Sequence, residues 1–116
     1  MPKFTLVLRE SGSSFTGLSP ADMQAIIARY TAWSQRLRDA GKLTASQKLR
    51  DGSGRVMVRS NGRVLVSDGP HAEAKEVIGG LFVVEADSYD EAVRIANDCP
   101  HLHFGTIEVR EVEIFR

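Results

Sequence analysis

The chain has 116 residues, and its fifteen basic and fifteen acidic side chains give a formal net charge of zero. A neutral chain lacks the positive field that attracts phosphate backbones and anionic lipids, so nucleic acid and membranes are disfavoured as partners. The length suits one domain, residues 1–116, with a core of its own.

The N-terminal ten residues, MPKFTLVLRE, turn from apolar to charged too soon for a signal peptide or a spanning helix, which predicts a cytoplasmic protein. Cys99 is the only cysteine, which excludes an intrachain disulfide and fits a reducing compartment. The sequence contains no P-loop, dinucleotide fingerprint, nucleophile elbow or zinc-protease helix. We therefore expect no cofactor, which leaves catalysis by a shaped pocket with a base and an electrostatic stabiliser open.

The first half of the chain predicts a strand, a helix and a second strand. Residues 3–9 alternate with a period of two, as in a strand with one buried face. Ser19-Pro20-Ala21-Asp22 has the pattern of a helix start, and the helix should end near Ala40, with Gly41 as its left-handed cap. Residues 43–49 form a weaker strand pattern. The apolar stripe of the helix consists of Met23, Ile26, Ile27, Tyr30, Trp33 and Leu37.

The second half predicts a hairpin, a strand, a short helix and a last strand. Residues 55–60 and 63–67 flank Asn61-Gly62, the pair that best suits a type I′ turn. A strand over 77–86 precedes a capping box at Ser88-Tyr89-Asp90-Glu91. The second helix should bury Ala92, Val93 and Ala96 and stop before Pro100. Residues 106–115 alternate, with a slip of apolar phase between Val109 and Val112 that indicates a bulge or a change of burial.

This order predicts an α+β protein, a ferredoxin-like split βαβ fold with an added β-hairpin. Right-handed crossovers would place both helices on one face of the sheet. The strand over 77–86 has consecutive apolar residues and therefore needs cover on both faces. Because two helices cover only one face, we expect a homodimer whose sheets pack face to face.

Residues 68–76 read DGPHAEAKE and are followed by Gly79-Gly80, Pro100, Gly105 and the run IEVR at 107–110. This pattern resembles the DGPF branch of the YCII-related family over nearly the whole chain. The resemblance implies dimeric α+β barrels of ferredoxin-like subunits. Some relatives outside this branch are implicated in chemistry on halogenated hydroxyaromatic rings, and some members stand beside or are fused to sigma-factor-like transcription proteins.

The chain departs from the family pattern at two positions. A histidine in the first helix and an aspartate have been proposed as the active pair of the wider family, and Tyr30 occupies the position that we match to that histidine. The DGPF branch usually has phenylalanine where this chain has His71.

The loop after the hairpin supplies the candidate catalytic residues. Asp68 could accept a proton from a substrate, or its side chain could only bond the amides of a turn. His71 could be a general base, since an imidazole titrates near neutrality, or an ordinary surface histidine. Glu73 and Lys75 could form a polar rim for substrate or be simply solvated.

Three further residues are candidates for binding substrate. Tyr30 and Trp33 on the first helix could face a ligand pocket, although aromatic residues at helical spacing are usually core. Glu10, at the end of the first strand, could add a second carboxylate to the site or be a loop acid.

Cys99, His101 and His103 alternate, and thiolate and imidazole groups are zinc ligands. The spacing matches no recognised zinc motif and Pro100 bends the segment, so we predict no metal site.

Together these observations predict a cofactor-free enzyme that acts on a small organic molecule, for example a hydroxyaromatic compound, by acid/base chemistry. Asp68 and His71 would be catalytic, and the substrate would be bound by Glu10, Tyr30, Trp33, Glu73 and Lys75. Two alternatives remain open: a non-catalytic ligand-binding or regulatory module with a sigma-factor-type partner, and a structural dimer without a ligand.

Overall fold

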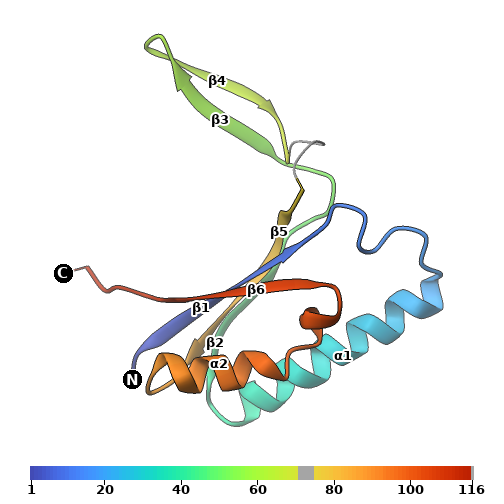
Figure 1. Ribbon diagram of the computed structural model, residues 1–116, viewed down its shortest axis with the longest axis vertical. Helices are drawn as coiled ribbons and strands as arrows, with labels where there is room; N and C mark the ends of the chain where they lie inside the picture. The colour runs from blue at the N-terminus through green and yellow to red at the C-terminus, as the bar shows by residue number, and fades with distance from the viewer. Residues whose placement is uncertain (71–74, 116) are drawn as a thin grey trace.

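The computed structural model describes residues 1–70 and 75–115. In this part of the chain a four-stranded sheet is covered on one side by two helices, and a separate hairpin projects from it (Figure 1). The elements in chain order are β1 (Lys3–Glu10), α1 (Pro20–Asp39), β2 (Leu43–Lys48), β3 (Arg55–Ser60), β4 (Arg63–Asp68), β5 (Val77–Glu85), α2 (Tyr89–Asn97), a 3₁₀ helix (Pro100–His103) and β6 (Gly105–Glu111).

The four-stranded sheet has the order β2-β5-β1-β6, and each neighbouring pair is antiparallel. With the hairpin left out, this is the strand order of the ferredoxin-like split βαβ fold, so the predicted fold class is confirmed. Both helices lie on the same side of the sheet (Figure 1), as right-handed crossovers require.

Both helices begin where the capping residues predict. The Ser19 side chain accepts a hydrogen bond from the backbone amide of Asp22 at 3.1 Å, and the Ser88 side chain accepts one from that of Glu91 at 3.2 Å. Gly41 has a φ of +71° just beyond the end of α1, as a left-handed cap needs. Within the described residues, neither helix is both long and apolar enough to cross a bilayer.

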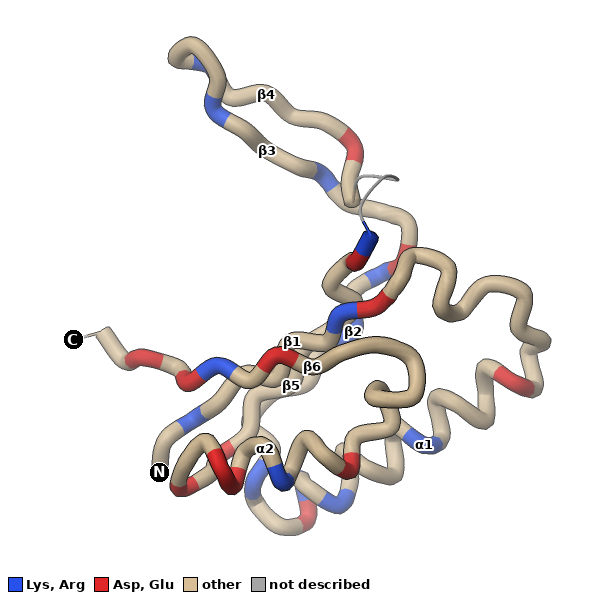
Figure 2. The backbone as a smooth tube through the Cα atoms, viewed as in Figure 1, with Lys and Arg blue, Asp and Glu red and all other residues tan. Residues whose placement is uncertain are grey.

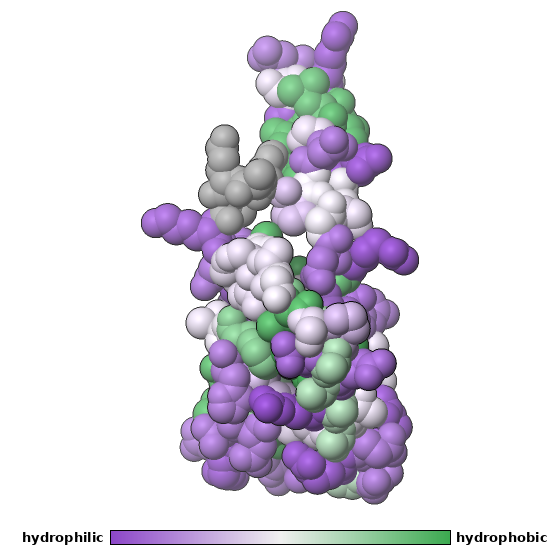
Figure 3. Space-filling view, turned by 90° about the vertical axis from the view of Figure 1, so that its right-hand side faces the viewer, coloured by the Kyte–Doolittle hydropathy of each residue, from purple (hydrophilic) through white to green (hydrophobic). Residues whose placement is uncertain are grey.

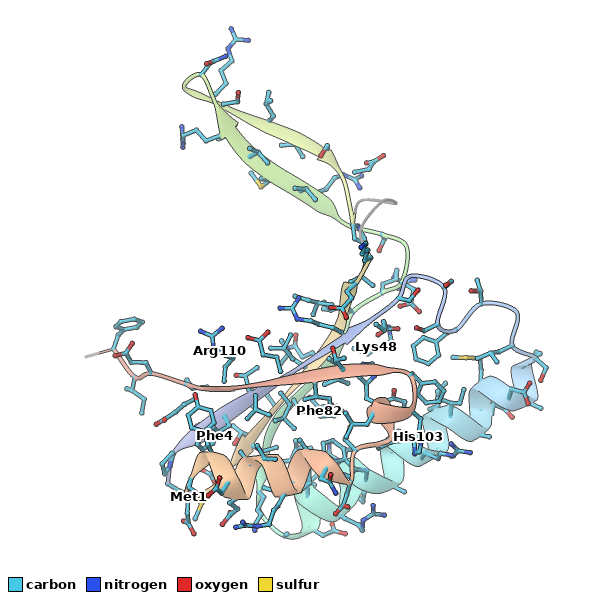
Figure 4. The ribbon with its side chains drawn as sticks, viewed as in Figure 1. Met1, Phe4, Lys48, Phe82, His103 and Arg110 are labelled. Atoms are coloured by element: carbon cyan, nitrogen blue, oxygen red, sulfur yellow. The ribbon has the colours of Figure 1, made fainter. Side chains whose placement is uncertain are left out.

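The hydrophobic core lies between the sheet and the two helices. Phe4 and Phe82 point from the sheet toward the helices (Figure 4). Trp33 of α1 packs edge-to-face on Phe82, with ring centroids 4.8 Å apart. Other buried members of this core are Leu6, Leu8, Val84, Ala92 and Ala96.

Two details of the predicted apolar pattern were wrong. Ile27 and Val93 are exposed. Each directly follows a buried residue of its helix, and successive helical residues point in different directions. Of the two alternatives for the phase slip, the change of burial agrees with the structure: β6 ends at Glu111, and residues 112–115 are exposed. The Val112 amide makes one last backbone hydrogen bond, to the Lys3 carbonyl at 2.8 Å.

The face of the sheet opposite the helices is mixed in character. Val7, Leu81 and Val83 are half-buried at its centre. Beside them Glu108 bridges Arg9 at 3.1 Å and Arg110 at 3.2 Å, and acidic and basic residues alternate along β6 in Figure 2. Strand β5 therefore carries apolar side chains on both faces of the sheet. The homodimer inferred from this feature stays a prediction.

The β3–β4 hairpin, residues 55–68, forms an arm that leaves the body of the protein (Figure 1). Asn61 and Gly62 have φ values of 50° and 76°, as the predicted type I′ turn requires. The arm exposes apolar side chains (Figure 3), among them Met57 at 68% and Val66 at 58%. It also makes the radius of gyration 16.2 Å, whereas a compact chain of this length has about 13 Å.

Candidate active site

A cavity of about 300 Å³ lies between α1, the 3₁₀ helix and the neighbouring ends of β1, β2 and β5. Its walls are mostly apolar, and Figure 4 labels two of the lining residues, Phe82 and Lys48. A second hollow of about 410 Å³ between α1 and α2 is more open and is lined mainly by charged side chains. We place the candidate site in the smaller cavity because it contains the buried polar groups Glu10 and His101.

Glu10 enters this cavity from the last residue of β1, and the residue is only 5% exposed. Leu8 pairs with Gly80 and Arg9 with Ile78, so Gly79 is the extra residue of a β-bulge. A side chain at Gly79 would overlap the Glu10 carboxylate, so the glycine provides the space for this acid. Burial raises the pKa of Glu10, the nearby Lys48 ammonium lowers it in part, and Asp51 raises it.

A second polar group in the cavity is the hydrogen-bonded pair of Tyr30 and His101. The Tyr30 hydroxyl lies 2.9 Å from His101 Nδ1, and His101 Nε2 lies 2.8 Å from the backbone carbonyl oxygen of Arg9. His101 is 1% exposed, and a side chain at Gly105 would overlap the same Arg9 carbonyl. The bulge at Gly79 and the close approach at Gly105 therefore bring the carboxylate and the imidazole into one cavity.

Burial keeps both members of this pair neutral near pH 7. It lowers the pKa of His101, an effect that the Arg9 carbonyl opposes and the Lys48 charge reinforces. Burial also raises the pKa of the Tyr30 hydroxyl, and Cys99 and Glu10 add to this shift. The cavity thus holds a neutral phenol, a neutral imidazole and a carboxylate that accepts protons more readily than usual.

Two of the predicted site residues, Glu10 and Tyr30, line this cavity, whereas Trp33 does not. Trp33 is buried against Phe82 in the core, which is the alternative that its helical spacing left open.

Asp68 and Lys75, the two described residues among the candidates in the loop after the hairpin, do not line this cavity. Asp68 ends the arm, where its side chain is 96% exposed and 3.4 Å from Arg55. Lys75 is also exposed and does not line the cavity, while His71 and Glu73 lie outside the described residues. Within a single chain Asp68 is therefore outside the candidate site, and its catalytic role stays a prediction without geometric support.

Sequence reasoning missed His101 as a member of the candidate site, because it considered this residue only as a metal ligand with Cys99 and His103. The segment is a 3₁₀ helix and not an extended strand, so alternate side chains do not share a face. Burial raises the pKa of the Cys99 thiol to about 11, and His103 is exposed. Among the described residues no three possible ligands come together. No local signal pairs His101 with Tyr30, because 71 residues separate them.

Glu10→Gln should stabilise the protein at neutral pH and have little effect in acid. Because burial raises the pKa of Glu10 above its ordinary value of 4.5, this group favours the fold fully below pH 4.5. That stability is lost as the pH rises through the higher folded-state pKa. We expect a gain of at most about 1 kcal/mol, because the amide carries no charge that burial penalises and the nearby Lys48 ammonium already offsets part of that penalty. Thermal melts of both proteins at pH 4 and pH 7.5 measure it.

Glu108→Gln is the matched control with the opposite sign. Hydrogen bonds from Arg110 and Arg9 hold the pKa of Glu108 below its ordinary value. Its contribution is therefore present above pH 4.5 and is lost as the pH falls through the lower folded-state pKa. The control should be less stable than the wild type at pH 7.5, with the difference closing in acid. A Glu10→Gln protein destabilised equally at both pH values would contradict a carboxylate whose pKa is raised by burial.

Comparison with known proteins places the chain in a family. An uncharacterised protein of Rhizobium meliloti (strain 1021), R00369, is 29% identical over 101 residues, which cover 84% of this chain and 82% of that protein. The structure of 5-chloro-2-hydroxyhydroquinone dehydrochlorinase (TftG) from Burkholderia phenoliruptrix AC1100, in complex with 2,5-dihydroxybenzoquinone, aligns with a TM-score of 0.48 at 18% identity. That alignment covers 96% of this chain and 93% of the other. The model of the YCII-related domain matches residues 5–116, nearly the whole length, and the chain therefore belongs to the YCII-related family.

Proposed function

We propose that the protein is an enzyme that moves a proton on a small hydroxyaromatic molecule by means of its own side chains. The observation that carries this proposal is the presence of the Glu10 carboxylate and the Tyr30–His101 pair in one apolar cavity. Perturbed titratable groups that share a cavity are typical of active sites.

The size and walls of the cavity favour a small flat molecule. Its volume of about 300 Å³ is at the lower end of the range for ligand pockets, which is roughly 300–1,000 Å³. Phe15 and Phe82 offer aromatic surfaces for a ring, and Ile26 and Leu8 complete an apolar lining. Apolar contact with the walls would supply most of the affinity for a ligand. The few polar groups would set its orientation.

Glu10 is the group suited to carry the proton. A carboxylate in an apolar site has a pKa shifted toward neutrality, which makes it an effective general base. In the proposed step a proton leaves one atom of the substrate, is held on Glu10, and is returned to another atom of the same molecule. The net change is an isomerisation, in which no electrons are gained or lost. Tyr30 would hold a polar group of the substrate in place, and the Lys48 ammonium would balance charge near Glu10.

Exchange of ring hydrogens tests this proposal directly. Resorcinol in D₂O exchanges its ring hydrogens by protonation at carbon, and ¹H NMR measures the rate with and without the protein. We expect the protein to accelerate this exchange and Glu10→Gln to lower the accelerated rate about 100-fold or more, the usual contribution of a general acid or base. Melting curves show that the variant is folded.

Asp68→Asn is the matched control, since it makes the same change of carboxylate to amide outside the cavity. It should leave the exchange rate unchanged. Loss of exchange in Asp68→Asn and not in Glu10→Gln would move the site to the loop after the arm. Binding of resorcinol without exchange would instead support the non-catalytic ligand-binding module.

A further inference from the structure

The hydrogen-bond chain that ends at Tyr30 has a fixed direction. It starts at the Arg9 carbonyl oxygen, a backbone atom that can only accept. His101 Nε2, at 2.8 Å from that oxygen, must therefore carry the proton. A neutral imidazole with its proton on Nε2 has an acceptor at Nδ1, so Tyr30 Oη donates its proton to Nδ1 over 2.9 Å.

Ser34, on the same helix as Tyr30, also uses its hydroxyl proton within the protein. Its hydroxyl lines the cavity and donates to the backbone carbonyl of Thr31 at 3.1 Å, so only its lone pairs remain for a ligand. An ionised Glu10 has lone pairs alone. Lys48, which also lines the cavity, gives two of its three N–H groups to Asp51 at 2.8 Å and to the Leu49 carbonyl at 2.5 Å.

We propose that the cavity presents a wall of hydrogen-bond acceptors, Tyr30, Ser34 and Glu10, and therefore selects substrates that carry two or more free hydroxyl groups. An ether or carbonyl oxygen at the same place would face a lone pair and gain nothing. The inference rests on the proposed function, because it takes this cavity as the substrate site, and it adds which hydroxyaromatic compounds fit.

The surrounding backbone fixes the direction of these hydrogen bonds. Reversal of the chain would place the unprotonated Nε2 against the Arg9 carbonyl, leaving two acceptors in contact. The imidazole cannot turn away, because it is 1% exposed and lies beside Gly105, where an added Cβ would be 2.9 Å from Nε2. His101 acts through Tyr30, so it is a positioning residue for the substrate hydroxyl.

Stepwise methylation of the ligand tests the acceptor wall. Resorcinol, 3-methoxyphenol and 1,3-dimethoxybenzene have the same ring and two, one and no hydroxyl donors. We expect each methylation to weaken binding about tenfold, as for the loss of one hydrogen bond, although the added methyl group is apolar. NMR titration measures the three dissociation constants and reports whether the cavity residues shift.

Three variants test whether this selection depends on the hydrogen bonds that join Tyr30, His101 and Arg9. Tyr30→Phe should reduce the preference for resorcinol over 3-methoxyphenol about tenfold, because it removes one acceptor. His101→Gln should keep the preference, since an amide can donate to Arg9 and accept from Tyr30, whereas His101→Leu frees the Tyr30 proton and should lose it. Unchanged selection in both Tyr30→Phe and His101→Leu would overturn the proposal.

The tautomer of His101 gives a test that needs no ligand and no variant. The ¹⁵N chemical shifts of the wild-type protein near pH 7 should show a proton on Nε2 and none on Nδ1, with exposed His103 as an internal comparison. An Nδ1–H tautomer or an imidazolium would overturn the inference. Equal binding of the three compounds would overturn it while leaving the proposed function intact, and binding of none in the cavity would overturn both.

Discussion

Gly105→Ala should destabilise the protein by about 3 kcal/mol and lower its melting temperature by roughly 10 °C. The new Cβ would overlap the Arg9 carbonyl oxygen and lie 2.9 Å from His101 Nε2. Neither neighbour can move freely, because Arg9 is paired on both sides, with Ile78 and with Thr106. Backbone overlap inside a sheet therefore cannot relax as a flexible side chain would. Thermal denaturation measures the effect.

The matched control is Gly12→Ala in the loop before α1. A Cβ at Gly12 meets no atom within 4 Å, so this change should be neutral or slightly stabilising. If Gly105→Ala melts within about 1 °C of the wild type, the packing of His101 between Arg9 and Gly105 is wrong. Nothing would then hold His101 Nε2 against the Arg9 carbonyl oxygen.

Local signals in the sequence were sufficient for the elements and their order. Ser19 and Ser88 cap the helices because a side-chain oxygen satisfies an amide of the first turn, an interaction that spans three residues. Asn61-Gly62 closes the hairpin because both residues tolerate positive φ. Such contacts are short-range, so composition and spacing reveal them, and the order of elements then limits the topology to very few arrangements.

The candidate site could be predicted only in part, because its geometry depends on contacts between distant segments. Glu10 and Tyr30 were candidates by residue type and position alone. Their environment comes from Gly79, which makes room for the carboxylate, and from His101, which is 92 residues from its partner Arg9. A bulge and a close backbone approach leave no periodic pattern in the sequence.

The arm explains why Asp68, the first residue of the DGPH stretch, lies away from the cavity. Alternation in residues 55–68 predicts a hairpin equally well on the main sheet or away from it, since the pattern is the same. In the structure β3 and β4 pair only with each other among the described strands. Because Asp68 belongs to the arm, it lies outside the cavity and forms an ion pair with Arg55.

We expect the protein to form a homodimer in solution, with a mass about twice the 12.8 kDa of one chain. The occupant we propose for the uncovered apolar surfaces is a second copy, because the open sheet face has a half-buried apolar centre and the charged groups beside it are already paired within the chain. The arm supports this, since an isolated two-stranded ribbon is only marginally stable. Analytical ultracentrifugation at micromolar concentration measures the mass, and a monomer would contradict the expectation.

Two single substitutions identify which surfaces make the contact. Val83→Asp places a charge at the centre of the open sheet face, and Leu65→Asp places one on the exposed arm. Because an unpaired buried charge at an interface is costly, each should weaken the dimer about 100-fold, or roughly 3 kcal/mol. Gln24→Asp on the exposed side of α1 is the control and should remain a dimer. If Leu65→Asp alone stays dimeric, the sheets meet without the arm. If Val83→Asp stays dimeric, the open face is not the interface, and the argument from two-sided apolar character in β5 fails.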